Sequence, residues 1–203
     1  MQDTYNTLLK ESEGFYKEKG SKFIGLAKAC ISEAQAKEQL KIWKTEHSKA
    51  GHLCYAYRIG VHQQKIRSSD DGEPSNSAGA PIQGQIQSFK LTNVLIGVVR
   101  YYGGTKLGVG GLIQAYRQAA KDAIENNKIV EKELFNTLEI SFGYMQMPLV
   151  MNWIKQNKII VLHQDLDEHC LVRVEIAQAR YEQLKSNLLK INPISIESEI
   201  IGT

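Results

Sequence analysis

The hydrophobic and polar positions of the chain follow two periods, which together predict both strands and helices. Residues 52–60 alternate in the manner of a half-buried strand. One of its faces carries the apolar or aromatic side chains of Leu53, Tyr55, Tyr57 and Ile59. The other carries His52, Cys54, Ala56 and Arg58. Residues 94–101 (VLIGVVRY) are nearly all apolar, as expected of a central strand covered on both faces.

The rest of the first half contains further strands and three helices. Ser32 with Gln35 forms a capping-box pattern, and a helix follows with its inner face formed by Ala36, Leu40 and Trp43. Pro81 suits the first turn of a second helix, whose buried stripe is Ile82, Ile86 and Phe89. The remaining segments read as strands over 8–16 and 22–30, a polar loop over 62–80, a glycine-rich stretch over 103–111 and a helix over 112–126.

The second half predicts the order strand–helix–strand–strand–helix–strand. The segments are 136–142, 147–157, 159–164, 170–176, 178–190 and 194–201. This β-α-β-β-α-β order is that of a ferredoxin-like domain. A short linker over 127–134 precedes it, so we expect an α+β chain with one domain over 1–133 and a second over 134–203.

One face of the second predicted sheet is acidic. In the strands, apolar residues such as Leu138 and Ile140 alternate with polar ones. The outward set contains one basic residue, Arg173, and the four acidic residues Glu139, Glu175, Glu197 and Glu199. Such a face repels phosphate and offers no aromatic platform for RNA. It is either simply solvated or a surface for a protein partner, which could be the first domain.

Charge and composition bound the class of protein. The formal net charge is +3, from 25 Lys and Arg against 22 Asp and Glu. Residues 1–133 hold 19 basic and 14 acidic residues (+5), and residues 134–203 hold 6 and 8 (−2), so an anionic partner is expected for the first half only. No apolar run approaches a membrane span, and the start of the chain lacks a signal-peptide pattern. With three scattered cysteines, the chain is expected to be cytoplasmic and to have no membrane contact.

The first candidate site is the acidic loop SSDDGEPSNSAGAP, residues 68–81. Carboxylates this close repel one another unless a cation lies among them. Three arrangements satisfy them: a Mg²⁺ ion, a basic partner such as Arg67, Arg100 or Lys106, or hydrogen bonds to loop amides and helix ends. The candidate residues are Ser69, Asp70, Asp71 and Glu73.

The second candidate site is VVRYYGGTKLGVGGLIQAY, residues 98–116, where glycines lie between a buried strand and a helix. Exposed backbone N–H groups at a helix start can cradle an anion, although the glycines can equally serve tight turns and close packing. The candidates here are Arg100, Tyr101, Tyr102, Gly103, Gly104, Lys106, Gly108, Gly110 and Gly111. His52, at the mouth of its strand, is a further candidate, whereas Cys54 is assigned a packing role.

Taken together, HLCYAYRIG, SDDGEP, AGAPI and VVRYYGGTKLGVGGL resemble the YigZ/Impact family, in order and spacing over the whole chain. The resemblance implies a first domain like the second domain of ribosomal protein S5, and a ferredoxin-like second domain like a domain of elongation factor G. It also implies a link to translation, because eukaryotic relatives restrain a translational stress kinase. One departure is Asn76-Ser77 where relatives have Gly-Thr, and Asn tolerates the positive φ that glycine allows.

Two functions follow as hypotheses. The preferred one is a binding or regulatory module that contacts RNA or the translation machinery through Arg100, Tyr101, Tyr102 and Lys106. The alternative is a Mg²⁺-dependent enzyme acting on a phosphorylated small molecule or nucleotide at the glycine loop, but no nucleophile or base is evident for it. No cofactor and no catalytic residue are assigned. We also expect the acidic loop, residues 69–74, to lie beside Arg100–Gly104, because three close carboxylates need a cation and Arg100 is the only charge in an otherwise apolar strand.

Overall fold

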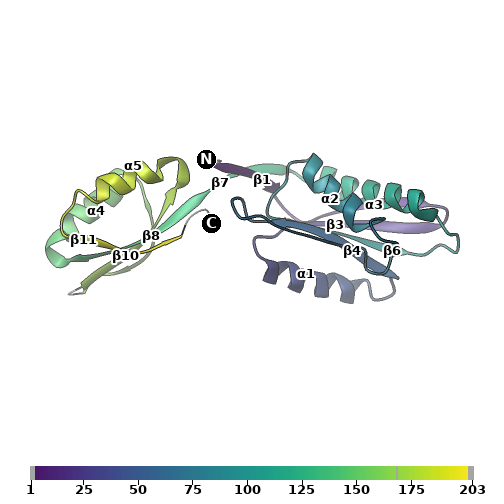
Figure 1. The fold of residues 1–203 in the computed structure, drawn as a ribbon. Coiled ribbons are helices and arrows are strands. Elements are labelled where there is room, and N and C mark those ends of the chain that lie inside the picture. The colour runs from purple at the N-terminus through teal and green to yellow at the C-terminus, as the bar shows by residue number, and fades with distance from the viewer. Residues whose placement is uncertain (1–2, 168, 201–203) are drawn as a thin grey trace. The chain divides into compact units, whose positions relative to one another are not determined.

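The computed structural model describes residues 3–167 and 169–200, and its contacts divide the chain into two compact units. The first unit is Tyr5–Lys132, and the second contains the rest of the chain. Helices and strands are mixed in both, which confirms the α+β class (Figure 1). Within the described residues, no helix combines the length and the apolar character needed to cross a membrane.

The first unit is built on a five-stranded antiparallel sheet of order β2-β3-β6-β4-β5. The strands are β2 (Ser12–Glu18), β3 (Ser21–Ala29), β4 (His52–Ile59), β5 (Lys65–Ser69) and β6 (Val94–Tyr101). The central strand is β6, and all of it except Tyr101 is buried, as its apolar run predicted. A separate pair is formed by β1 (Thr4–Leu8) and β7 (Ile129–Glu133).

Helices cover both faces of this sheet, as Figure 1 shows. On one face lies α1 (Glu33–Glu46), and on the other lie α2 (Gly79–Ser88) and α3 (Gly108–Glu125). The predicted start of α1 is confirmed, because the Ser32 hydroxyl accepts a hydrogen bond from Gln35 N at 3.2 Å. The Gln35 side chain reaches back to Ile31 N at 3.1 Å, so it caps one residue earlier than in the usual capping box.

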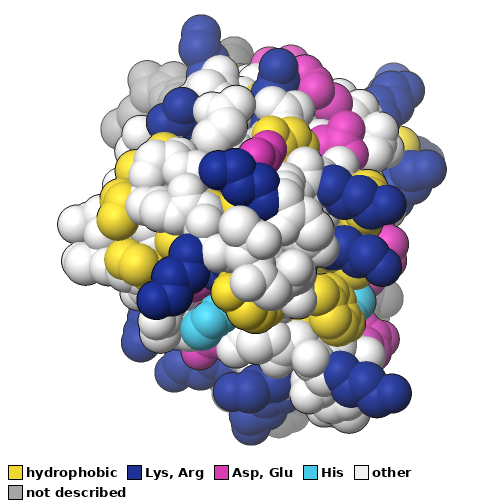
Figure 2. Space-filling model, turned by 90° about the vertical axis from the view of Figure 1, so that its right-hand side faces the viewer, with side chains coloured by type: hydrophobic (Ala, Val, Ile, Leu, Met, Phe, Trp, Pro, Cys, Tyr) yellow, Lys and Arg dark blue, Asp and Glu magenta, His cyan; other side chains and the backbone are white. Residues whose placement is uncertain are grey.

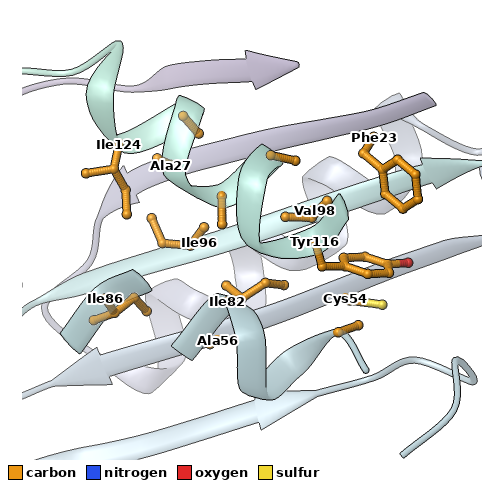
Figure 3. Packing of buried hydrophobic residues seen from close by; sticks show 14 of the residues in the cluster. Phe23, Ala27, Cys54, Ala56, Ile82, Ile86, Ile96, Val98, Tyr116 and Ile124 are labelled. Carbon is orange, nitrogen blue, oxygen red and sulfur yellow. The ribbon is translucent and has the colours of Figure 1, made fainter. Parts of the chain in front are cut away.

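The two faces of β4 are those that the alternation predicted, but residues of both are buried, each face in a different core of the first unit. Cys54 and Ala56 join the α2–α3 core, whereas Tyr57 and Ile59 join the α1 core. Figure 3 shows the first of these, with the Tyr116 ring beside Cys54 at one end of the cluster. Helix α3 packs so closely on β3 that a Cβ atom at Gly25 would lie 2.1 Å from the Ala119 carbonyl oxygen.

The second unit has the predicted element order. It consists of β8 (Phe135–Gly143), α4 (Met147–Gln156), β9 (Ile160–Asp165), β10 (His169–Ala177), α5 (Gln178–Leu188) and β11 (Ile194–Ile200), with a short 3-10 turn, η1 (Tyr144–Gln146), before α4. The four strands pair antiparallel in the order β11-β8-β10-β9. Apolar side chains of β8 and β10 pack under α4 and α5, whose buried residues include Val150, Trp153, Tyr181 and Leu184.

Several predicted boundaries in the first half are wrong. The expected strand 8–16 is two strands, β1 and β2, and the loop 62–80 contains β5. The expected linker 127–134 contains β7. β5 and β7 lie at the edge of a sheet or in a two-stranded ribbon, where side chains stay exposed and leave no apolar signal. Helix α3 begins at Gly108 rather than Leu112, because the glycines of its first turn have a low helix propensity and give no helical signal in the sequence.

The acidic face of the second sheet is also different from the prediction at Glu199. The register of β11 on β8 shifts between Ile196 and Ser198, so the alternation reverses there. As a result, Glu199 turns toward α5 and pairs with Lys185 at 2.6 Å. This pairing lowers the pKa of Glu199. On the open face, Glu139 is paired with Arg173, whose Nε donates to it at 2.8 Å.

Candidate functional site

Asp70 holds the start of α2. Its Oδ1 accepts hydrogen bonds from Ala78 N at 3.0 Å and Gly79 N at 2.8 Å, and its Oδ2 accepts one from Asn76 N at 2.9 Å. Burial would raise the pKa of Asp70, but these three N–H groups outweigh it and lower the pKa. Asn76 has a φ of 61°, so this Asn does adopt the conformation predicted for it.

Asp71 ties the same loop to the start of β4. Its Oδ2 accepts a hydrogen bond from Leu53 N at 2.8 Å, and its carbonyl oxygen lies 2.7 Å from His52 Nδ1. The second contact assigns the proton to Nδ1, since a carbonyl can only accept. Ser69 contributes its hydroxyl oxygen, which accepts from Asp71 N at 3.3 Å. Hydrogen bonds to backbone groups, one of the three predicted arrangements, therefore account for Asp70 and Asp71.

Glu73 makes the ion pair that the sequence predicted between the two loops. Its Oε1 accepts from Arg100 Nη1 at 2.7 Å and from the Tyr116 hydroxyl at 2.7 Å. His52 Nε2 lies 4.0 Å from the same oxygen. The acidic loop thus lies beside the end of β6, as expected, but the contact is made by Glu73 and not by the two aspartates.

The Arg100 guanidinium is held by Glu73 and by two aromatic rings. Its guanidinium lies over the rings of Phe23 and Tyr102, at 5.6 and 5.4 Å from their centroids. Only 8% of the side chain is exposed, and its Nε is buried without a hydrogen-bond partner among the described residues. Arg100 therefore acts as a support for Glu73 and Tyr102 and is not a side chain that extends into solvent.

The three carboxylates do not point to a common cation. Asp70, Asp71 and Glu73 each have a different set of partners, and among the described residues no group of three His, Cys, Asp or Glu could hold a metal ion. Cys54 has the packing role predicted for it. Burial raises its pKa to about 12, and its thiol donates to the Asp70 carbonyl at 3.0 Å.

A pocket of about 530 Å³ opens beside the Glu73–Arg100 pair. Its polar lining consists of His52, Glu73, Arg100 and Lys106. Its apolar lining consists of Pro74, Tyr102, Leu107, Val109 and Leu112, with the backbone of Gly108 between them. Tyr102 is 57% exposed and Lys106 is exposed, so an aromatic ring and an ammonium group are both free to contact a ligand.

The first turn of α3 also faces this pocket through Gly108. Leu107, at the N-cap position, has no group that accepts a hydrogen bond, and no described side chain caps the turn. The N–H groups at this helix end therefore keep their partial positive charge available. Gly104 and Gly108 have φ angles of 86° and 72° with open space at the Cβ position, and the Cβ position of Gly110 is open too.

Not every candidate residue lines this pocket. Gly103 packs on Gly20, where a Cβ atom would lie 1.9 Å from a backbone carbon, so its role is close packing. Gly111 packs near Leu107. Tyr101 lines a separate hollow, where its hydroxyl lies 2.9 Å from His47 Nδ1.

Tyr116 was predicted only as part of the inner face of a helix. It is fully buried, with its ring edge-on to Phe23 at 5.2 Å and its hydroxyl on Glu73. Figure 3 shows that hydroxyl at the border of the core. The signal was available in the sequence, because a buried Tyr usually finds a hydrogen-bond partner.

Figure 1 shows the loop after β6 at one end of the sheet of the first unit, and Figure 2 looks onto that end. Lys and Arg side chains are spread over this face around small apolar patches, with histidine beside them (Figure 2). This surface fits the excess of basic residues in the first half of the sequence.

Comparison with known proteins identifies the family. The model of the family described as the Impact N-terminal domain matches residues 19–124, more than half of the chain, and this range holds the acidic loop and the glycine loop. The chain belongs to the IMPACT family. The resemblance read from the four motifs is thereby confirmed.

Two relatives illustrate the range of similarity within the IMPACT family. The member YvyE of Bacillus subtilis is 32% identical over 141 residues, which are 70% of this chain and 65% of that protein. The chain thus covers slightly less than two thirds of YvyE. The member YigZ of Escherichia coli is 28% identical over 181 residues, which are 88% of this chain and 89% of that protein.

A solved structure supports the fold over the full length. The protein is similar to a crystal structure described as that of a hypothetical protein, with a TM-score of 0.77 and 24% identity. The likeness covers 97% of each chain. This similarity supports the fold alone and gives no information on activity.

Proposed function

We propose that the first unit binds RNA at the pocket beside Glu73 and Arg100, as a module linked to translation. The observation that carries this proposal is the meeting of an exposed aromatic ring, Tyr102, with an ammonium group, Lys106, at the uncapped start of α3. An aromatic platform beside a positive groove is the usual arrangement for binding single-stranded nucleic acid.

The phosphate would bind at the start of α3. The N-terminal end of a helix attracts anions through its free N–H groups and its dipole. At α2, the corresponding place is already occupied by the Asp70 carboxylate. At α3 the corresponding place borders the pocket, together with the exposed ammonium group of Lys106.

The base would stack on Tyr102. Arg100, held by Glu73, lies 5.4 Å from the centre of this ring and fixes it without blocking its exposed part. Leu107, Val109 and Leu112 give the pocket an apolar wall. Stacking of this kind tolerates any base, because every base has a π face.

The proposed link to translation rests on the family resemblance and on what it implies for the two domains. The family resemblance implies a first unit like the second domain of ribosomal protein S5 and a second unit like a domain of elongation factor G, and the β-α-β-β-α-β order of the second unit is compatible with the latter. The two parts of the sequence carry +5 and −2, so the first is suited to RNA and the second to a protein partner on its acidic sheet face. We place this activity in the cytoplasm, where the buried free thiols of Cys30, Cys54 and Cys170 would stay reduced.

The test measures binding of a fluorescein-labelled tetrauridylate to the full-length protein over a range of KCl concentrations. Lys106→Gln is expected to weaken binding and to reduce the slope of log K against log salt by about 0.7, the value for one phosphate on a single strand. Tyr102→Leu is expected to weaken binding by roughly 5- to 150-fold with little change in slope, because stacking contributes about 1–3 kcal/mol per base.

Lys41→Gln is the matched control. It removes the same charge from the exposed side of α1, away from the pocket, and should leave both affinity and slope unchanged. Equal effects of the Lys106 and Lys41 variants, or binding without salt dependence, would contradict the proposal.

A further inference from the structure

A second hollow lies on the α1 side of the same sheet, next to the pocket. It has a volume of about 390 Å³, and Tyr102 lines both cavities. Its other lining residues are Gly20, Lys22, Ile24, His47 and Tyr101. None of these described residues is acidic, and the Tyr101 ring is held in place by the contact between its hydroxyl and His47 Nδ1 at 2.9 Å.

The sheet beside this hollow is not covered by α1. Phe15 of β2 pairs with Ile24 of β3 in the strand register, and 48% of its side chain is exposed. Directly paired residues in antiparallel strands point to the same side of the sheet, so Phe15 extends the apolar surface of the hollow. Lys17 lies over the Phe15 ring, with its Nζ 5.3 Å from the centroid.

Two lysines face each other on this surface. Lys17 of β2 is directly opposite Lys22 of β3, and both side chains are exposed. Like charges at directly opposite positions of a sheet repel and destabilise the pair. An anion bound between them would relieve this repulsion, which is an argument for an anionic occupant.

The far end of the same face has the opposite character. A hollow of about 480 Å³ there is lined by three acidic residues, Glu11, Glu13 and Glu46. Lys28, which also lines it, is already paired with Glu11 at 2.6 Å. A polyanion would be repelled from this end, so the surface suited to it stops near Phe15.

We propose that the pocket and the second hollow form one track for a single RNA strand, which turns around Tyr102 from the start of α3 onto the open surface of β2 and β3. This inference rests on the proposed function and extends it from one nucleotide to a strand. Tyr102, Tyr101 and Phe15 offer rings to successive unpaired bases, and Lys106, Lys22 and Lys17 accompany the phosphates. In a duplex, the bases are stacked on one another and cannot reach such rings.

The experiment compares labelled oligouridylates of two to twelve nucleotides with a duplex RNA of twelve base pairs, all on the full-length protein. Affinity is expected to rise by roughly 5- to 150-fold when the strand becomes long enough to occupy both cavities, as one further stacked base would give. Lys22→Gln and Phe15→Leu should each reduce this gain and leave the binding of the dinucleotide unchanged. Lys106→Gln should weaken the binding of both the dinucleotide and the longer strand, and Lys41→Gln should weaken neither.

The outcomes separate the two proposals. Failure of the dinucleotide to bind, or its indifference to Lys106→Gln, overturns the proposed function. Two other results are informative when the dinucleotide binds as expected: longer strands bind no more tightly, or Lys22→Gln leaves the affinity for the longer strand unchanged. Either result would overturn the track and leave the proposed function of the pocket intact. Equal binding of the duplex would overturn the single-strand assignment. Competition by polyglutamate at equal charge concentration would assign the surface to an acidic protein instead.

Discussion

Arg100 donates a hydrogen bond from Nη1 to Oε1 of Glu73 at 2.7 Å, and the exposed fractions of the two side chains are only 8% and 4%. This pair joins the central strand to the acidic loop and sets the floor of the candidate pocket. Removing one partner of a buried ion pair leaves an uncompensated charge, which usually destabilises by about 3–5 kcal/mol.

We therefore expect Glu73→Leu to lower the free energy of unfolding of the first unit by about 3–5 kcal/mol. Urea denaturation followed by the fluorescence of Trp43, in a Trp153→Phe background, measures this unit selectively, because Trp153 belongs to the second unit. Adding Arg100→Met to Glu73→Leu should restore much of the loss, since no charge then stays buried.

The exposed pair of Arg173 and Glu139 provides a matched comparison. Here 48% of the Arg173 side chain and 15% of the Glu139 side chain are exposed, so this pair is better solvated than Glu73 and Arg100, and solvent-exposed ion pairs contribute up to about 1 kcal/mol. Glu139→Leu should accordingly change the stability of the second unit by no more than about 1 kcal/mol. A similarly small effect of Glu73→Leu would show that the Arg100 charge is compensated elsewhere.

Asp70 gives a prediction on pH. Its folded pKa is lowered, so its contribution to stability is present above the unfolded pKa of about 3.9 and is lost as pH falls through the folded pKa. Asp70→Ala should cost about 0.5–2 kcal/mol at pH 7, as for the loss of a helix cap, and the difference from the parent protein should shrink below about pH 4. Denaturation curves of both proteins between pH 2.5 and 7 measure this difference in the free energy of unfolding. A difference that stays constant across this range would rule out the ionised cap.

The elements with a strong apolar pattern could be predicted from the sequence, and the edge elements could not. β6 and β4 bury side chains on both faces, so their apolar run and their alternation were sufficient evidence. β5 and β7 bury little, and their residues (KIRSS and IVEKE) look like loop. β5 forms a hairpin with β4, the strand just before it, and β7 pairs with β1 near the start of the chain; neither pairing buries enough apolar side chains to leave a pattern in the sequence.

In the candidate site, the charges of the two loops were enough to predict that the loops lie close together. They were not enough to predict which partner each carboxylate binds. Arg100 is the only charged residue in an apolar strand, so a carboxylate partner was expected. Whether Asp70, Asp71 or Glu73 reaches it depends on the turn between them, where Asp71 and Gly72 have positive φ angles of 43° and 88°. The orientation of Glu199 likewise depends on a register shift that strict alternation cannot anticipate.

Glycines of α2, of α3 and of the loop before α3 should respond to alanine according to their φ angles. Gly84, inside α2, and Gly110, in the first turn of α3, have open space at Cβ and no positive φ, so Ala should stabilise by up to about 1 kcal/mol at each. Gly104 and Gly108 have positive φ, and Ala there should destabilise by about 1 kcal/mol or more. Thermal denaturation of the four variants and of the parent protein gives the order of their stabilities. Gly110→Ala should also leave RNA binding unchanged, because Gly110 does not line the pocket.

The thiol of Cys54 should react only when the first unit unfolds. Burial raises its pKa to about 12, so the reactive thiolate is scarce at pH 8, and the residue has no exposed surface. Iodoacetamide labelling followed by mass spectrometry of peptides should therefore show Cys54 protected in the native protein. Glu73→Leu should accelerate its labelling by the same factor by which it raises the unfolding equilibrium constant, roughly 10² to 10³ or more for 3–5 kcal/mol. Rapid labelling of Cys54 in the parent protein would mean that the loop carrying Asp70, whose carbonyl accepts the thiol hydrogen bond, opens without unfolding of the unit.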